Sequence, residues 1–179
     1  MKKIILKCKL NNLDRFENQL SDIDLDFGAI YWQHDRVYVP RGYKRGQNLP
    51  RLIMRTEIHA VDESPKYSLI LRRHIEDSGV DIVEDTPIKD YASAVNIILQ
   101  LGFKLAGEVS RRRQDLQTGE GTTIHLDQIE SPDGTSTAYA KIESVLSPED
   151  SITEAKADLL KTFKTLGESN IIDSAYFEV

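Results

Sequence analysis

The sequence is poor in cysteine, in long apolar runs and in net positive charge. Cys8 is the only cysteine among 179 residues, which excludes an intramolecular disulfide and a cysteine-based metal cluster. No apolar run approaches the ~20 residues that a membrane-spanning helix needs, and Lys7 ends the opening apolar run far short of a signal-peptide core. A net charge of −6 argues against a general nucleic-acid binder, which neutralises many phosphates. We therefore expect a cytoplasmic protein with no membrane and no nucleic-acid partner.

The chain also lacks a Gly/Ser linker or a low-complexity tract that would mark a domain boundary. With 40% hydrophobic and 29% charged positions, it can bury a proper core. We predict one domain over residues 1–179. Cys8 alternates with Leu6 and Leu10 and is expected to be a small buried apolar residue.

Strand-like segments with turn formers between them recur along the chain, and about eight antiparallel strands are expected. Together with helices between and after them, they predict an α+β domain whose sheet can curl and close. The predicted strands are 3–10, 29–39, 51–61, 67–74, 80–85, 104–116, 122–129 and 137–146.

Three helices are predicted from capping residues and apolar stripes. Asn12 caps a short helix, and Asp90 caps a second. Ser147 caps a third, with Pro148 at its first helical position. A glycine follows the second and the third helix as a C-terminal stop. A short apolar strand or turn is expected at 171–179.

Charged side chains recur on one face of the predicted strands. Successive strand residues point to opposite faces, so residues at even spacing share a face. A single strand of this kind can simply face water. Repetition over five strands favours a charged interior, because small closed barrels can hold a polar ligand. The residues that share a face are Lys7 with Lys9, Ser68 with Arg72, Arg111 with Arg113, His125 with Asp127, and Lys141 with Glu143.

Other polar and aromatic residues receive structural interpretations. Tyr31 and Trp32 are expected in the core or at the mouth of a tunnel. Arg112 should point outward, because its neighbours in the sequence face inward. His125 is expected to be a surface or a satisfied core histidine rather than a catalytic one.

Many short segments, in order and spacing, resemble the CYTH superfamily. The class IV adenylate cyclase-like and thiamine triphosphatase-like proteins are the most similar members. The resemblance implies an antiparallel barrel with flanking helices, the triphosphate tunnel, in which basic residues hold a nucleotide or inorganic triphosphate and carboxylates hold divalent metal. The segments are Lys7-Cys8-Lys9-Leu10, Gln33-His34-Asp35-Arg36-Val37-Tyr38, Leu52-Ile53-Met54-Arg55, Leu69-Ile70-Leu71-Arg72, Ile98-Leu99-Gln100-Leu101-Gly102-Phe103, Arg111-Arg112-Arg113, Ile124-His125-Leu126-Asp127, Lys141-Ile142-Glu143 and Ser174-Ala175-Tyr176.

The chain departs from the family pattern mainly at its carboxylates. When the lysine of the opening Glu-x-Glu-x-Lys motif is placed on Lys9, the two glutamates fall on Ile5 and Lys7. A later glutamate falls on Val83, and a basic position of the family falls on Ile53. The closing Glu-Ile-Glu motif has also become Lys-Ile-Glu at 141–143. The chain therefore matches the basic positions of the family pattern better than its carboxylate positions.

The resemblance nevertheless implies two sets of site residues. The candidate metal ligands are Asp85, Asp127 and Glu143, with Glu57 as an addition in an active enzyme. Replacing glutamates by Lys7 and Lys141 sets positive charge where a cation would sit. The candidate phosphate-binding residues are Lys7, Lys9, Arg55, Arg72, Arg111, Arg113 and Lys141.

Three functions remain open at this point. The first is a CYTH-like protein that binds a nucleoside triphosphate or inorganic polyphosphate, with metal-dependent catalysis weak or lost. The second is an active adenylate cyclase-like or triphosphatase enzyme that uses the reduced carboxylate set and Mg²⁺ or Mn²⁺. The third is a protein-interaction scaffold, since fold does not dictate function. No cofactor is needed without catalysis, and a homodimer is compatible with the sequence.

Overall fold

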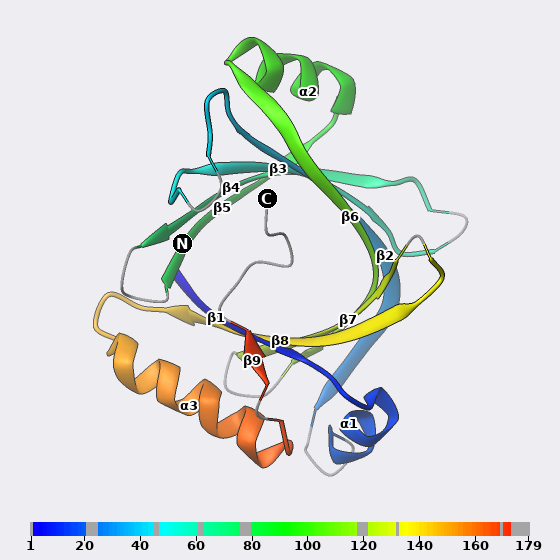
Figure 1. The fold of residues 1–179 in the computed structure, drawn as a ribbon, viewed down its shortest axis with the longest axis vertical. Helices are drawn as coiled ribbons and strands as arrows, with labels where there is room; N and C mark the ends of the chain where they lie inside the picture. The colour runs from blue at the N-terminus through cyan, green and yellow to red at the C-terminus, as the bar shows by residue number, and fades with distance from the viewer. Residues whose placement is uncertain are drawn as a thin grey trace.

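The computed structural model of the chain describes residues 2–20, 25–44, 47–60, 63–75, 80–117, 122–131, 133–168 and 170–172. Its nine strands and three helices are arranged as a barrel with helices outside it (Figure 1). The helices are α1 (Leu13–Leu20), α2 (Tyr91–Gln100) and α3 (Ile152–Thr165). The strands are β1 (Lys2–Lys9), β2 (Asp26–Pro40), β3 (Arg51–Ile58), β4 (Lys66–Ile75), β5 (Val80–Ile88), β6 (Phe103–Gln117), β7 (Thr122–Glu130), β8 (Ser136–Leu146) and β9 (Ile171–Ile172).

Eight of the strands close into an antiparallel barrel. Their order is β5-β4-β3-β2-β6-β7-β8-β1, and β1 pairs with β5 to complete the ring. The closing pair is short, since only Lys2, Lys3 and Ile4 of β1 face partners on β5. Further along the same edge, β1 pairs with β9. The predicted α+β barrel of about eight strands is therefore confirmed.

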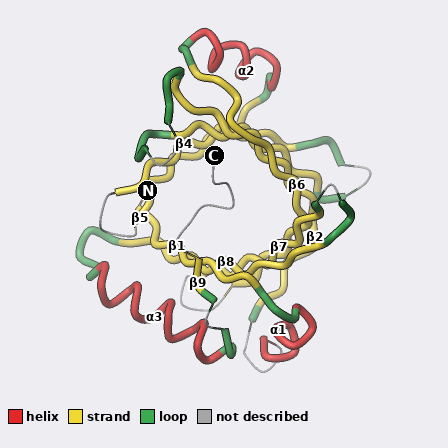
Figure 2. The backbone as a smooth tube through the Cα atoms, in the orientation of Figure 1, coloured by secondary structure: helices red, strands yellow, loops and turns green. Residues whose placement is uncertain are grey.

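The helices lie outside the barrel, α1 and α3 on one side and α2 on another (Figure 2). Ile4, Leu6 and Cys8 alternate along β1 and pack with Phe16 of α1 and Phe163 of α3 in the main apolar core. The alternation of β1 therefore decides which face lies under the helices. Cys8 is fully buried, as its position between Leu6 and Leu10 predicts.

Helix α2 packs on a separate part of the outer surface. Its Ile98 is buried with Tyr38 of β2 and Met54 of β3 in a second outer cluster. Asp90 caps the helix as predicted, because its carboxylate accepts a hydrogen bond of 3.0 Å from the Ser93 backbone N–H. The outward faces of the strands pack in the main core under α1 and α3 and in this cluster under α2. The opposite face of each strand therefore points into the barrel interior.

The N-terminus of α3 differs from the prediction. The helix is capped by Ser151, whose hydroxyl accepts from the Glu154 backbone N–H at 3.4 Å, and not by Ser147 with Pro148. The Ser147 backbone N–H donates to the Asp150 carboxylate at 2.7 Å and so belongs to a turn before the helix. A serine followed three residues later by a glutamate is the stronger cap here, because it satisfies a helical N–H directly.

Smaller differences concern single residues and segment ends. Trp32 lies on the outward face of β2 and is 49% exposed, so it belongs to neither the core nor the tunnel. Arg112 is exposed as predicted. β3, which was predicted to reach Val61, ends at Ile58. The predicted closing segment forms β9 at its start, and residues 173–179, with the motif at 174–176, lie outside the described residues. No described helix is long and apolar enough to cross a membrane.

Candidate functional site

The predicted site residues lie on the inward faces of the barrel strands. Lys7 points inward, because its neighbours Leu6 and Cys8 pack outward against the helices. Residues directly opposite one another in register share a face, so Lys141, which is paired with Lys7, also faces inward. Following the register around the barrel places the other predicted cations on the same face. These are Lys9, Arg55, Arg72, Arg111 and Arg113.

A continuous arginine–aspartate network crosses the interior between β3 and β7. Arg55 donates to both oxygens of Asp35 at 2.8 and 3.0 Å, and Arg111 donates to Asp35 from the other side. Arg113 binds both oxygens of Asp127 at 2.6 and 2.7 Å, while Arg111 lies 3.6 Å from the same carboxylate. Burial would raise the pKa of Asp35, but the charges of Arg55 and Arg111 outweigh it and lower the pKa.

This network gives three of the predicted phosphate ligands a structural role. Arg111 and Arg113 are each 3% exposed, and Asp35 is also 3% exposed. Paired, buried charges of this kind hold their partners in fixed positions, and removing one leaves the others uncompensated. Sequence reasoning missed Asp35, because only the register brings it between arginines from two other strands.

A second cluster lies on the β4–β5 side of the barrel. Arg72 donates through Nε to Asp81 at 2.9 Å, and a second guanidinium nitrogen binds the same oxygen. The other Asp81 oxygen lies 3.0 Å from Nδ1 of His74, whose side chain is half exposed. Asp81, which is 4% exposed, is a further interior carboxylate that the family pattern did not indicate.

Glu143 is surrounded by basic side chains. Lys3 and Lys141 each lie 2.6 Å from one of its oxygens, and Nε2 of His125 lies 3.4 Å away. Burial would raise the pKa of Glu143, but the interaction with His125 and the charge of Lys141 hold it well below its usual range. Burial lowers the pKa of Lys141 to about 8, against the opposing effect of Glu143.

His125 also links this cluster to Asp115 of β6 and, through Asp115, to Tyr31 of β2. Its Nδ1 lies 2.5 Å from Asp115, and the Tyr31 hydroxyl donates to the other Asp115 oxygen at 2.8 Å. The histidine therefore sits between two carboxylates, but its buried Nε2 makes no hydrogen bond within the described part of the chain, so the ring is only partly satisfied. Tyr31 is buried and stacks on His59, with ring centroids 4.4 Å apart.

Lys7 lies near other cations in the barrel interior. It is 5% exposed. Burial lowers its pKa well below the ordinary value, and the charges of Arg72, Lys141 and Arg111 lower it further, while Asp81 opposes the shift. Such a position attracts an anion, because a negative group among these cations would be stabilised by all of them.

One sector of the interior is apolar. Val37, Ile53 and Ile70 form a buried cluster, and Val83 packs against it. Ile53 stands where the family has a basic residue, and Val83 where it has a carboxylate. The two positions at which the resemblance implies a cation and a carboxylate therefore lie together, in apolar packing.

The carboxylates that remain do not fit a divalent metal. Asp85 is exposed on β5, while the oxygens of Asp127 and Glu143 already bind basic side chains. Within the described ranges, no three His, Cys, Asp or Glu side chains form a group that could hold a metal ion. A divalent ion ~5 Å from a buried ammonium such as that of Lys141 would be repelled by roughly 7 kcal/mol at an effective dielectric constant of about 20.

Glu57, the additional carboxylate of the active-enzyme hypothesis, is hydrogen-bonded to an amide side chain, unlike Asp127 and Glu143 with their basic neighbours. It accepts a hydrogen bond of 2.8 Å from the side-chain amide of Gln33, which is 1% exposed. Lys9, by contrast, lies exposed at the end of β1.

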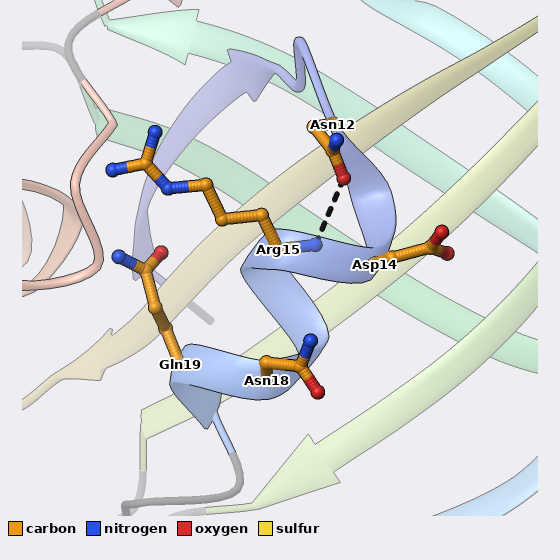
Figure 3. Close-up of a pocket in the computed structure, with 5 residues that line it drawn as sticks. All are labelled: Asn12, Asp14, Arg15, Asn18 and Gln19. Atoms are coloured by element: carbon orange, nitrogen blue, oxygen red, sulfur yellow. Dashed lines mark hydrogen bonds between the residues drawn. The ribbon is translucent and has the colours of Figure 1, made fainter.

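A polar pocket lies outside the barrel on α1 (Figure 3). Asn12 caps this helix, because its side-chain oxygen accepts from the Arg15 backbone N–H at 2.9 Å. The pocket contains none of the interior residues above. It is lined by Asn12, Asp14, Arg15, Asn18 and Gln19.

The fold and the interior together define a closed antiparallel barrel that turns an ion-paired, mainly basic wall inward. No family model and no curated protein matches the chain. Solved structures do match it. The PH1819 protein from Pyrococcus horikoshii is 21% identical, with a TM-score of 0.84, over 98% of this chain and 96% of that one.

Two further structures carry descriptions of activity. A putative adenylate cyclase from Vibrio parahaemolyticus is 16% identical, with a TM-score of 0.76, over 97% of this chain and 94% of that one. A putative adenylyl cyclase from Hippeastrum, described as having a dominant triphosphatase activity, is 16% identical, with a TM-score of 0.59, over 99% and 92%. The resemblance to CYTH proteins is therefore confirmed at the level of the fold.

Proposed function

We propose that this protein binds a nucleoside triphosphate or an inorganic polyphosphate inside the barrel, with metal-dependent catalysis weak or lost. The observation that carries the proposal is the position of Lys7, which is buried and faces Arg72, Arg111 and Lys141. These cations disfavour one another, although Arg72, Arg111 and Lys141 are each also paired with a carboxylate. A chain of phosphate groups would reverse that repulsion, since lysines act as point charges toward phosphate and arginines as planar donors.

The basic face also argues against a scaffold that has abandoned small-molecule binding. Its cations converge from β1, β3, β4, β6 and β8 on one interior face, as a binding site for a polyanion would need. The active-enzyme alternative needs carboxylates that can bind metal, and the oxygens of Asp127 and Glu143 are engaged by basic side chains. Binding without turnover is therefore the function that the geometry supports best.

Thermal unfolding in the presence of a chelator tests the binding. Inorganic triphosphate, ATP, GTP and thiamine triphosphate form the panel. A ligand at about 100 times its dissociation constant should add ~2.7 kcal/mol of stability. For a domain of this size that is a rise in melting temperature of roughly 5–11 °C. Lys7→Met should abolish most of the rise, whereas Lys2→Met, on the outward face of the same strand, should leave it intact. An unchanged melting temperature across the panel would favour the scaffold.

A phosphate-release and cyclic-nucleotide assay tests the loss of catalysis. With Mg²⁺ or Mn²⁺, the wild-type protein should form almost no product from the same panel, because Lys7 and Lys141 lie where the resemblance expects metal-binding glutamates. Robust turnover that disappears in a folded Glu143→Gln variant would establish the active-enzyme alternative instead.

A further inference from the structure

Two arginines face each other across β3 and β4 on the inward side of the barrel wall. Arg51 and Arg72 are direct partners in the register. Residues at even spacing in a strand share a face, so Arg51 points the same way as Ile53, which packs in the interior cluster with Val37. Arg51 is the first residue of β3. It therefore lies on the interior face near the end of the barrel at which β3 begins, and the sequence did not indicate it as a phosphate-binding residue.

The two arginines differ in their partners. Arg72 binds Asp81 through two guanidinium nitrogens, with Nε at 2.9 Å. The second oxygen of Asp81 lies 3.0 Å from Nδ1 of His74. Arg51, by contrast, forms no side-chain ion pair with any residue that the structure describes. Asp81 is therefore occupied by Arg72 and His74, and the two arginines together carry more charge than this carboxylate neutralises.

A cation at position 51 works against the packing around it. Like charges directly opposite each other destabilise a sheet. Arg51 is half-buried, and the Arg72 side chain is 28% exposed, so water screens the pair only in part. The next inward residue of β3 is Ile53, and the residue opposite Arg72 on β5 is Val83. An apolar residue at position 51 would continue this packing and remove the repulsion, so a ligand explains Arg51 better than packing does.

The arginine pair continues the basic surface around Lys7. Burial lowers the pKa of Lys7, and among the charged groups Arg72 lowers it most. The ammonium of Lys7 and the guanidinium of Arg72 therefore act on the same part of the interior, and Arg51 lies next to Arg72 on the neighbouring strand. Two guanidinium groups side by side offer planar sets of N–H donors that match the oxygens of a phosphate group. A chain of phosphates that contacts Lys7 would meet Arg72 and then Arg51.

We infer that Arg51 is a further phosphate-binding residue and that the bound phosphate chain extends from Lys7 past Arg72 to the end of the barrel at which β3 begins. This inference rests on the proposed binding function, and it adds the direction in which the ligand lies. Arginines bind the chain at that end through paired N–H donors, whereas lysines bind it further inside as point charges.

Calorimetric titration of inorganic triphosphate in the presence of a chelator tests the inference. Arg51→Met should raise the Kd about ten- to a hundredfold, since it removes charge-assisted hydrogen bonds. Arg73→Met is the matched control, because it removes the same charge from the residue after Arg72, on the outward and exposed face of β4. The control should bind as wild type. An unchanged Kd in Arg51→Met, or an equal loss in the two variants, would overturn the inference.

Stability without ligand separates a binding residue from a structural one. Arg51→Met should unfold at a slightly higher temperature than wild type, by up to ~4 °C, because it relieves the repulsion with Arg72. Arg51→Lys, which keeps the charge but not the planar donors, should recover part of the binding lost in Arg51→Met. A lower melting temperature of Arg51→Met, together with a lysine variant that binds no better, would assign Arg51 a structural role and overturn the inference. If Arg51→Met does not fold, Arg51→Gln gives the same comparison.

The outcomes separate the two proposals. Triphosphate binding by the wild-type protein that Arg51→Met leaves unchanged would overturn this inference and leave the binding function standing. Absence of heat from the wild-type protein, for every phosphate compound in the panel, would overturn the binding function and this inference with it.

Discussion

Removing the charge of Asp35 should destabilise the barrel strongly. Asp35→Asn keeps the shape of the carboxylate but leaves Arg55 and Arg111 as buried cations without their shared anion. Breaking a buried ion pair by removing one partner costs about 3–5 kcal/mol. For a domain of 150–250 residues, each kcal/mol lowers the melting temperature by about 2–4 °C, so we expect a decrease of roughly 6–20 °C.

Thermal and urea unfolding followed by circular dichroism measure this loss, and Glu108→Gln is the matched control. Glu108 also pairs with an arginine, Arg36, at 3.2 Å, but both side chains are more than a third exposed. A surface pair contributes about 0–1 kcal/mol, so the control should unfold within a few degrees of wild type. If Asp35→Asn were as stable as wild type, or if both variants lost the same stability, the buried network would not be what holds these strands in place.

The remaining predictions concern pH and helix capping. The pKa values of Asp35, Asp115 and Glu143 are lowered in the folded state. Their contribution is therefore complete above the unfolded pKa values near ~4, and it is lost as the pH falls below them toward the lower pKa values of the folded state. Melting temperatures measured from neutral pH to about pH 3 should fall steeply below ~4, and a flat profile would contradict the pairing. At α3, Ser151→Ala should lower the free energy of unfolding by about 1 kcal/mol. Ser147→Ala should change it by less than ~0.5 kcal/mol in the same urea titration. Equal losses in the two variants would contradict the assignment of Ser151 as the cap.

The sequence was sufficient to predict the barrel, because its strands alternate over short distances. Lys7 and Lys9 lie on one face of β1, and Leu6 and Cys8 lie on the other. This alternation does not depend on which strands pair with β1. The start of α3 was predicted wrongly, since Ser147 with Pro148 and Ser151 both satisfy local capping rules. Only the turn between Ser147 and Asp150 decides between them.

The ion pairs of the interior could not be predicted in the same way. Asp35 lies in an ordinary strand segment, and its partners Arg55 and Arg111 come from β3 and β6. Whether two charges meet depends on the register between strands, which a single sequence does not contain. For the same reason, the loss of a basic residue at Ile53 and of an acidic one at Val83 looked like two separate departures, although the side chains pack in one cluster.

The closure of the barrel at β1 bears on how the chain folds. Lys3 and Glu143, which bind each other across the seam of β1 with β8, are 140 residues apart. The first strand can therefore pair within the barrel only after β5 or β8 has been formed. Topologies rich in such distant pairings fold slowly. A strand with unpaired edges tends to aggregate. Charged side chains at alternate positions reduce this tendency. The inward lysines of β1 are such charges, and we expect them to disfavour association of the unpaired strand while the rest of the barrel forms.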